Sequence, residues 1–164
     1  MRNIYYWHTQ GNGWNDIGYN FLVDRFGRIY EGRAGGIERG VVGAHAGGWN
    51  TGSVGVAMLG NYNHTSPTST AVDAVTRLFA WKFRLHGIDP TRRVSVNGHH
   101  IRPLEGHRNL RGSYVPESGS SSFAQDCPGS SLYARMPAIR RAIGATTGPV
   151  AARPSPAARI PVAG

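Results

Sequence analysis

Residues 13–33 read GWNDIGYNFLVDRFGRIYEGR, and this stretch does most to decide the fold. Within it the runs NFLVD and RIYEGR are rich in apolar, β-branched and aromatic residues, and Gly27 lies between them. Two such runs on either side of a glycine are typical of a β-hairpin. A similar run, SVGVAMLG at residues 53–60, predicts another strand, and VSVNGHH at residues 94–100 is a candidate for one more.

A long helix is predicted over residues 71–86. Its apolar side chains recur every three or four positions, which is the spacing of one helical face. Thr70 followed by Asp73 resembles a capping box at the start, and Gly87 is expected to end the helix. The residues of this face are Val72, Val75, Phe79 and Phe83.

A second helix is predicted over residues 130–144, with Gly144 as its end and Pro137 as a point where it kinks or weakens. Helices mixed with buried strands indicate an α/β domain around one sheet. The apolar face of this second helix consists of Leu132, Met136, Ile139 and Ile143.

The composition predicts one domain followed by a tail. The chain has 164 residues, 40% of them hydrophobic, which is enough for a core of its own. Its last part is rich in Pro, Ala and Gly and has no acidic or aromatic residue. We therefore expect a domain over residues 1–146 and a disordered tail or linker over residues 147–164.

The charge of the chain favours an anionic partner. Its 18 basic residues outnumber the 9 acidic ones, the net charge is +9, and Lys82 is the only lysine. An anionic polymer such as bacterial cell wall suits this charge, and nucleic acid is the weaker alternative because the arginines form no stripe. No stretch has the roughly 20 apolar residues that span a bilayer, and the N-terminus shows no secretory signal.

Cys127, in the run QDCPG, is the only cysteine, and the run GHR places His107 upstream of it. A lone cysteine cannot form an intrachain disulfide, which leaves metal binding, nucleophilic attack or burial as a free thiol. Zinc binds cysteine sulfur and histidine nitrogen, and a catalytic zinc ion has three protein ligands. The interval is longer than in compact structural zinc modules, so spacing alone leaves both a metal-ligand pair and a buried thiol open.

Five runs follow one another along the chain: GWNDIGYNFLVDRFGRIYEGR, GAHAGGWN, SVGVAMLGNY, GHR and DCPG. Together they resemble the peptidoglycan recognition protein and type 2 amidase family, in particular its secreted actinobacterial members, over about residues 4–143. The resemblance implies a central mixed β-sheet flanked by helices, with a cleft for a muropeptide stem. It also implies a zinc ion that activates water to cleave the amide between N-acetylmuramic acid and L-alanine.

The resemblance implies roles for individual residues. His107 and Cys127 match the second and third zinc ligands, and Tyr19 matches a tyrosine near the metal that hydrogen-bonds the reaction intermediate or the attacking water. Gln125 stands where catalytic members carry a threonine or lysine, and its amide can still donate a hydrogen bond. The substrate-binding candidates are His45, Arg33, Trp49 and Asn50.

Several of these residues have a structural alternative. Tyr19 could be an ordinary tyrosine at a strand edge, and His45, which lies between small residues, could be a turn residue bonded to backbone. Arg33 could clamp a carboxylate of the peptide stem. It could equally be a structural partner of Glu31 or Asp24.

Three further residues are expected not to bind metal. Trp14 and Asp16 organise the loop before Tyr19, since a tryptophan after a glycine turn is more often involved in packing than in ligand recognition. His8 matches a family histidine that is not a metal ligand.

The chain departs from the family pattern at its zinc site. The family's first zinc ligand lies on an upstream strand, and this chain starts in what resembles the middle of the following helix, so we expect an N-terminally truncated domain that lacks its first strand and first ligand. His99 or His100 as a replacement would need a new geometry. Asn109 replaces an acidic residue, and residues 113–125 resemble an inserted polar loop.

The leading hypothesis is a zinc-dependent N-acetylmuramoyl-L-alanine amidase. The alternative is a non-catalytic peptidoglycan-binding module, because the first zinc ligand is absent from the sequence. Both hypotheses predict peptidoglycan or a muropeptide as the partner, no nucleic acid, a monomer, and a full-length protein outside the cell or in the cell wall.

Overall fold

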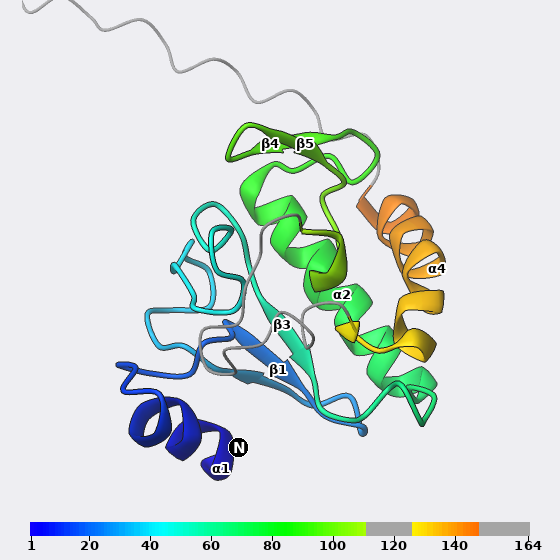
Figure 1. Cartoon of the computed structure of the whole chain (residues 1–164). Helices are drawn as coiled ribbons and strands as arrows, with labels where there is room; N and C mark the ends of the chain where they lie inside the picture. The colour runs from blue at the N-terminus through cyan, green and yellow to red at the C-terminus, as the bar shows by residue number, and fades with distance from the viewer. Residues whose placement is uncertain (111–125, 148–164) are drawn as a thin grey trace, which may run out of the picture.

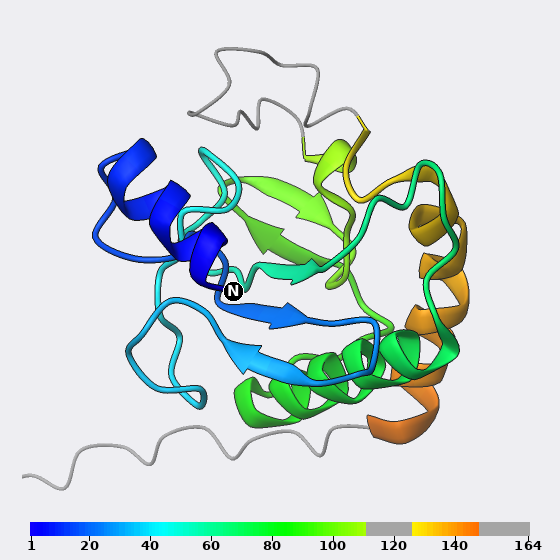
Figure 2. The same cartoon turned by 90° about the horizontal axis from the view of Figure 1, so that it is seen from below.

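The structure is a computed structural model of the chain and describes residues 1–110 and 126–147. Figure 1 shows its helices and strands, and Figure 2 shows the same arrangement from below. In chain order the elements are α1 (Arg2–Tyr6), the π-helix η1 (Trp7–Gly11), β1 (Phe21–Val23), β2 (Ile29–Glu31), β3 (Val56–Met58), α2 (Ser69–His86), β4 (Val94–Val96), β5 (His99–Ile101), the 3-10 helix η2 (His107–Asn109) and α4 (Ser130–Thr147).

β1 is the middle strand of a three-stranded mixed sheet. β2 pairs with it antiparallel and β3 pairs with it parallel, so the mixed sheet expected from the sequence is confirmed. Asp24 closes the turn between β1 and β2, because its Oδ1 accepts the backbone N–H groups of two turn residues, each at 2.9 Å. The hairpin around Gly27 is therefore confirmed as well.

The connection from β2 to β3, residues 32–55, contains neither helix nor strand. β2 and β3 run in opposite directions on either side of β1, so this connection begins and ends at the same end of the sheet and passes the start of β1. Connections of this length without regular structure are usually functional in compact domains. This one carries Arg33, His45, Trp49 and Asn50.

β4 and β5 form a separate antiparallel hairpin, in which Val96 lies opposite His99. Asn97 and Gly98 make its turn with φ angles of 50° and 77°, and two successive left-handed residues are typical of a type I′ turn. The sequence predicted one strand here. The Asn-Gly pair between two apolar runs is the signal that indicates a hairpin instead.

α2 begins earlier than predicted, because Thr68 caps it instead of Thr70. The Thr68 hydroxyl accepts a backbone N–H of the first helical turn at 3.2 Å and donates to the carbonyl of Arg25 at 2.6 Å. The second bond fastens the start of the helix to the β1–β2 turn. Gly87 ends the helix as predicted, in the left-handed conformation with φ 63°.

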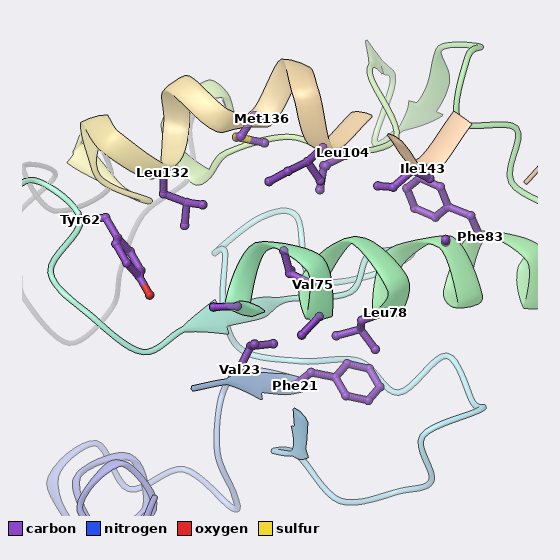
Figure 3. Packing of buried hydrophobic residues seen from close by; sticks show 14 residues of the cluster. Phe21, Val23, Tyr62, Val75, Leu78, Phe83, Leu104, Leu132, Met136 and Ile143 are labelled. Atoms are coloured by element: carbon purple, nitrogen blue, oxygen red, sulfur yellow. The ribbon is translucent and has the colours of Figure 1, made fainter. Parts of the chain in front are cut away.

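α2 lies between the sheet and α4, so the fold has three layers (Figures 1 and 3). Figure 3 shows Phe21 and Val23 of β1 on one side of α2, and Met136 and Ile143 of α4 on the other. Val23 and Ile143 are completely buried, together with Leu22. Burial of such side chains supplies about 1.5–3 kcal/mol each, which makes this the core of the domain.

α4 confirms its predicted apolar face, since all four of the predicted residues are buried. The helix continues through Pro137 and ends at Thr147, so the predicted end at Gly144 is wrong. The physical reason is packing: Ile143, completely buried just before Gly144, holds the last turns in helical form. The predicted tail over residues 147–164 lies outside the described residues, apart from Thr147.

Lys82 is a buried cation on α2, with an exposed fraction of only 2%. Its Nζ donates hydrogen bonds to the carbonyl of Ile37 at 3.0 Å and to that of Arg39 at 3.1 Å. The ammonium group also lies 5.3 Å from the ring centre of Trp81. A buried charge needs such partners, and these contacts tie α2 to the connection from β2 to β3.

Candidate functional site

His8 is a buried support of the loop that carries Tyr19. Its exposed fraction is 3%, and its Nδ1 accepts the backbone N–H of Gly18 at 3.1 Å. Its ring centre lies 5.0 Å from that of Trp14 and 5.6 Å from that of Tyr19. Burial, and then the charge of Arg33, lower the pKa of His8 and favour the uncharged ring. A neutral Nδ1 that accepts a hydrogen bond agrees with this.

Asp16 ties the same loop to the start of the β2–β3 connection. Its Oδ1 accepts the N–H of Ile17 and its Oδ2 accepts the N–H of Ala34, each at 2.7 Å. The carbonyl of Tyr19, a half-buried residue, accepts the N–H of Arg33 at 2.8 Å. These bonds confirm that Asp16 organises the loop, and they place Tyr19 beside Arg33.

Arg33 lies against the backbone of this loop. Its Nε donates to the carbonyl of Ile17 at 2.9 Å, and its Nη2 donates to that of Asp16 at 3.5 Å. No ion pair joins Arg33 to Glu31 or Asp24 within the part of the chain that the structure describes. The alternative that Arg33 serves as a structural partner of either carboxylate is therefore wrong. The carboxylate clamp stays a prediction.

His45 is seated between two glycines. A Cβ atom on Gly43 would clash with Cδ2 of the imidazole, and a Cβ atom on Gly55 would clash with its Cγ and Cδ2. The Nε2 atom is buried and has no hydrogen-bond partner among residues 1–110 and 126–147. Burial, followed by the charges of His107 and Arg33, lowers the pKa of His45 to about 4. The ring is therefore uncharged at neutral pH.

Asn50 and Trp49 shape the loop that follows His45. The Oδ1 atom of Asn50 accepts the backbone N–H groups of His45 and Ala46, each at 2.9 Å. Trp49 has an exposed fraction of 4%, and its ring centre lies 5.0 Å from that of His99 on β5. Both side chains therefore have partners inside the protein, and a contact with a ligand stays a prediction.

The GHR and DCPG runs lie side by side, although residues outside the described part separate them in sequence. The carbonyl of Cys127 accepts the backbone N–H of Arg108 at 3.1 Å and its Nε at 3.3 Å. Gly106 permits the close approach, since a Cβ atom there would lie 3.0 Å from Cδ of Pro128. These contacts place His107 and Cys127 on neighbouring segments.

Burial favours the uncharged forms of both side chains. It lowers the pKa of His107. Although Cys127 is exposed to solvent, the protein around its sulfur raises the pKa of the thiol, and the charge of Arg108 opposes this. A metal ion binds the thiolate and the neutral imidazole, so binding at Cys127 requires loss of a proton.

A polar network supports the turn that carries His107. Glu105 accepts from Nδ2 of Asn109 at 2.5 Å and from Nη2 of Arg140 at 3.0 Å. The hydroxyl of Tyr133 donates to Oδ1 of Asn109 at 2.8 Å. The network therefore has a carboxylate, from Glu105, although position 109 is an asparagine and not the expected acidic residue.

The described residues do not complete a three-ligand zinc site. No group of three or more His, Cys, Asp or Glu side chains that could hold a metal ion occurs in residues 1–110 and 126–147. The alternative with His99 or His100 as the replacement ligand forms no such group either. His107 and Cys127 offer zinc-type donors but do not fit the ion by themselves. Gln125 and the predicted polar loop lie outside the described residues.

Asn20 and the two glycines beside His45 were missed by sequence reasoning. Asn20 has an exposed fraction of 6%, and its side chain bonds to Val41 and Gly55. A polar residue at the start of an apolar strand is the signal that could have found it, since burial there requires partners. The identity of those partners depends on the path of the connection.

The chain matches the family described as N-acetylmuramoyl-L-alanine amidase over residues 2–129. Peptidoglycan-recognition protein SC2 of Drosophila melanogaster is 35% identical to it over 133 residues, which cover 81% of this chain and 58% of that protein. Peptidoglycan recognition protein 1 of Bos taurus is 31% identical over 128 residues, with coverage of 77% and 60%. The chain thus spans about three fifths of the length of these relatives.

Two solved structures agree with the fold. Wild-type Drosophila PGRP-LB is 32% identical with a TM-score of 0.61, covering 83% of this chain and 65% of that one. A chain in the complex of the PGRP-LCa and PGRP-LCx ectodomains with tracheal cytotoxin is 30% identical with a TM-score of 0.60. The match covers 82% of this chain and 65% of that one. The mixed α/β single domain is therefore confirmed, while a bacterial origin stays a prediction. On these grounds the chain belongs to the peptidoglycan recognition protein and type 2 amidase family.

Proposed function

We propose that this domain binds the peptide stem of peptidoglycan at the surface around Tyr19, Arg33, His45 and His107, the stem site. The observation that carries the proposal is the buried Nε2 of His45, which has no hydrogen-bond partner among the described residues. Leaving such an atom unsatisfied costs about 1–3 kcal/mol, so a ligand that bonds it recovers free energy. An uncharged imidazole suits the neutral amide groups of a peptide.

The charges around His45 support the same ligand. Arg33 and His107 both lower the pKa of His45, so both side chains lie near its ring. A guanidinium attracts the carboxylates of a peptide stem, and the net charge of +9 attracts anionic cell wall as a whole.

Two relatives support the ligand class. The PGRP-LCa and PGRP-LCx ectodomains are described in complex with tracheal cytotoxin, a monomeric diaminopimelic acid-type peptidoglycan. A tyrosine-to-phenylalanine mutant of Drosophila PGRP-LB, with a TM-score of 0.61 and 32% identity, is described with the same ligand. Peptidoglycan lies outside the cytoplasmic membrane, so the protein would act outside the cell or in the cell wall. We propose that it does so as a monomer. Within the described residues no helix is long and apolar enough to cross a membrane.

Hydrolysis of the amide between N-acetylmuramic acid and L-alanine is the second candidate function. The observation that favours it is the pair of bonds from Arg108 to Cys127, which brings two zinc-type donors, His107 and Cys127, onto neighbouring segments. A third ligand would be required. Tyr19 and Gln125 are the candidates to hydrogen-bond the reacting groups.

Cosedimentation with purified peptidoglycan sacculi tests the binding proposal. The wild-type protein should pellet with sacculi, and His45→Ala should pellet far less. His64→Ala is the matched control, because His64 is exposed and lies outside the stem site, and it should behave like the wild type. Equal pelleting of His45→Ala and wild type would show that the stem site is not used.

Release of stem peptides from the same sacculi separates the two functions. Released peptides, together with about one zinc ion per chain by elemental analysis, would establish the amidase. Binding without release would establish the binding module and exclude hydrolysis by this chain.

A further inference from the structure

Asn20 joins distant parts of the chain through all of its hydrogen-bonding groups. Its Nδ2 donates to the carbonyl of Val41 at 2.8 Å, and its Oδ1 accepts the N–H of Gly55 at 2.9 Å. Its backbone N–H donates to the carbonyl of Gly55, and its carbonyl accepts the N–H of Gly32, each at 2.9 Å. Gly32 and Gly55 are the first and last residues of the connection from β2 to β3, so Asn20 contacts both of its ends.

The side-chain amide closes the part of this connection that contains His45. Val41 lies just before Gly43, and Gly55 lies just before β3. Gly43 and Gly55 are the residues whose backbone leaves room for the imidazole of His45. One planar amide thus holds both walls of the seat in which His45 lies.

We propose that Asn20 is a positioning residue of the stem site, which holds both walls of the His45 seat so that the imidazole is preorganised for the ligand. The inference rests on the proposed function, since it requires His45 to contact the peptide stem. Asn20 itself acts through the loop, because its amide is occupied by the backbone of Val41 and Gly55. Binding geometry that is fixed in advance lowers the conformational entropy lost on association.

The position requires a donor and an acceptor on one short, rigid group. Asn20→Asp keeps an acceptor for Gly55 but puts a carboxylate oxygen against the carbonyl of Val41, which releases that end of the loop. Asn20→Ala removes both bonds. Comparison of the two variants therefore separates the effect of the bond to Val41 from that of the bond to Gly55.

A buried asparagine could also serve stability alone. In that case its variants would unfold more easily, while the folded protein bound its ligand as before. Leu78→Ala is the matched control for this interpretation. Leu78 is 5% exposed in the hydrophobic core on α2 and is not one of the stem-site residues, and its truncation destabilises the fold by leaving a cavity.

The experiment measures the affinity of the full chain for a muramyl tripeptide by calorimetry, at a temperature where circular dichroism shows each variant folded. Asn20→Asp and Asn20→Ala should bind at least about tenfold more weakly than wild type, which is about 1.4 kcal/mol. Leu78→Ala should bind like wild type. Amide hydrogen exchange at Gly55 should accelerate in Asn20→Ala and stay slow in Asn20→Asp.

Wild-type affinity in the Asn20 variants, with weakened binding in His45→Ala, would overturn the inference and leave the proposed function standing. Equal binding by wild type and His45→Ala would instead sink the proposed function, and the role of Asn20 with it. If Asn20→Ala does not fold, Asn20→Asp carries the test alone, because it retains the bond to Gly55.

Discussion

The carbonyl oxygen of Cys127 accepts two hydrogen bonds from Arg108, one from the backbone N–H at 3.1 Å and one from Nε at 3.3 Å. The same guanidinium donates to the carbonyl of Asp126 and lies 4.6 Å from the ring centre of Tyr133. A single arginine thus fixes the cysteine segment beside His107, its own neighbour in sequence. Its charge also opposes the effect of burial on the thiol.

We expect Arg108→Ala to raise the pKa of the Cys127 thiol further. Burial already raises this pKa, and the guanidinium is the group that lowers it. The measurement is the pH midpoint of alkylation by iodoacetamide, which should move to higher pH. Arg77→Ala, on the exposed face of α2, is the control and should leave the midpoint unchanged. A midpoint that falls or stays in Arg108→Ala would refute the prediction.

Acid is expected to destabilise the fold through His8. Because its folded pKa is lowered, the contribution of His8 is fully present above the ordinary value of 6.5 and is lost as the pH falls toward the folded pKa. The structural reason is that a protonated Nδ1 cannot accept the N–H of Gly18. His45, with a pKa of about 4, acts in the same direction.

Urea unfolding between pH 7.5 and 5 measures this loss. The free energy of unfolding should fall across the range in the wild type. His8→Gln should be less stable at pH 7.5 and should show a flatter profile, since it removes one of the groups that gain a proton on unfolding. A profile as steep as that of the wild type would mean that His8 is not the group involved.

Gly55→Ala should displace the imidazole of His45, because the added Cβ would occupy the space of the ring. We expect a loss of about 1–3 kcal/mol in the free energy of unfolding, the usual effect of overpacking. Binding of a muramyl tripeptide should weaken as well. Gly40→Ala is the control, since no atom lies within 4 Å of a Cβ there, and it should be neutral or slightly stabilising. Equal stability of the two variants would contradict the described seat.

Lys82→Met should lower the free energy of unfolding by about 1 kcal/mol. The substitution keeps a long apolar side chain and leaves the carbonyls of Ile37 and Arg39 without their donor. The lost desolvation penalty of the ammonium offsets part of this effect. Arg84→Met, at an exposed position of the same helix, is the control and should change stability little. A gain in stability for Lys82→Met would show that the two hydrogen bonds of Lys82 contribute no net stability.

The features predicted correctly depend on residues close together in sequence. The spacing that ends at Ile143 indicates a buried helical face, and Gly87 ends α2 where the pattern stops. Thr68 could not be chosen over Thr70 from the pattern, because its hydroxyl bonds to Arg25 in the distant β1–β2 turn. Gly144 did not end α4, since tertiary packing overrides the weak preference of one glycine.

The same difference between local pattern and tertiary contact applies to the candidate site. The motifs indicate which residues to consider, including His45, but not that its Nε2 is buried between two glycine backbones. Lys82 and Asn20 were missed for a related reason. Their partners lie 45 and 21 positions away, and a lysine or an asparagine is normally expected at the surface until a long connection brings backbone acceptors to it.

The most direct test of the stem site is an NMR titration of the ¹⁵N-labelled histidine side chains with a muramyl tripeptide. The proposal predicts that the Nε2 resonance of His45 shifts and saturates, as expected for a buried nitrogen that gains a hydrogen-bond partner, while the exposed His64 is unaffected. A titration in which His45 does not respond at saturating ligand, or responds no more than His64, would contradict it.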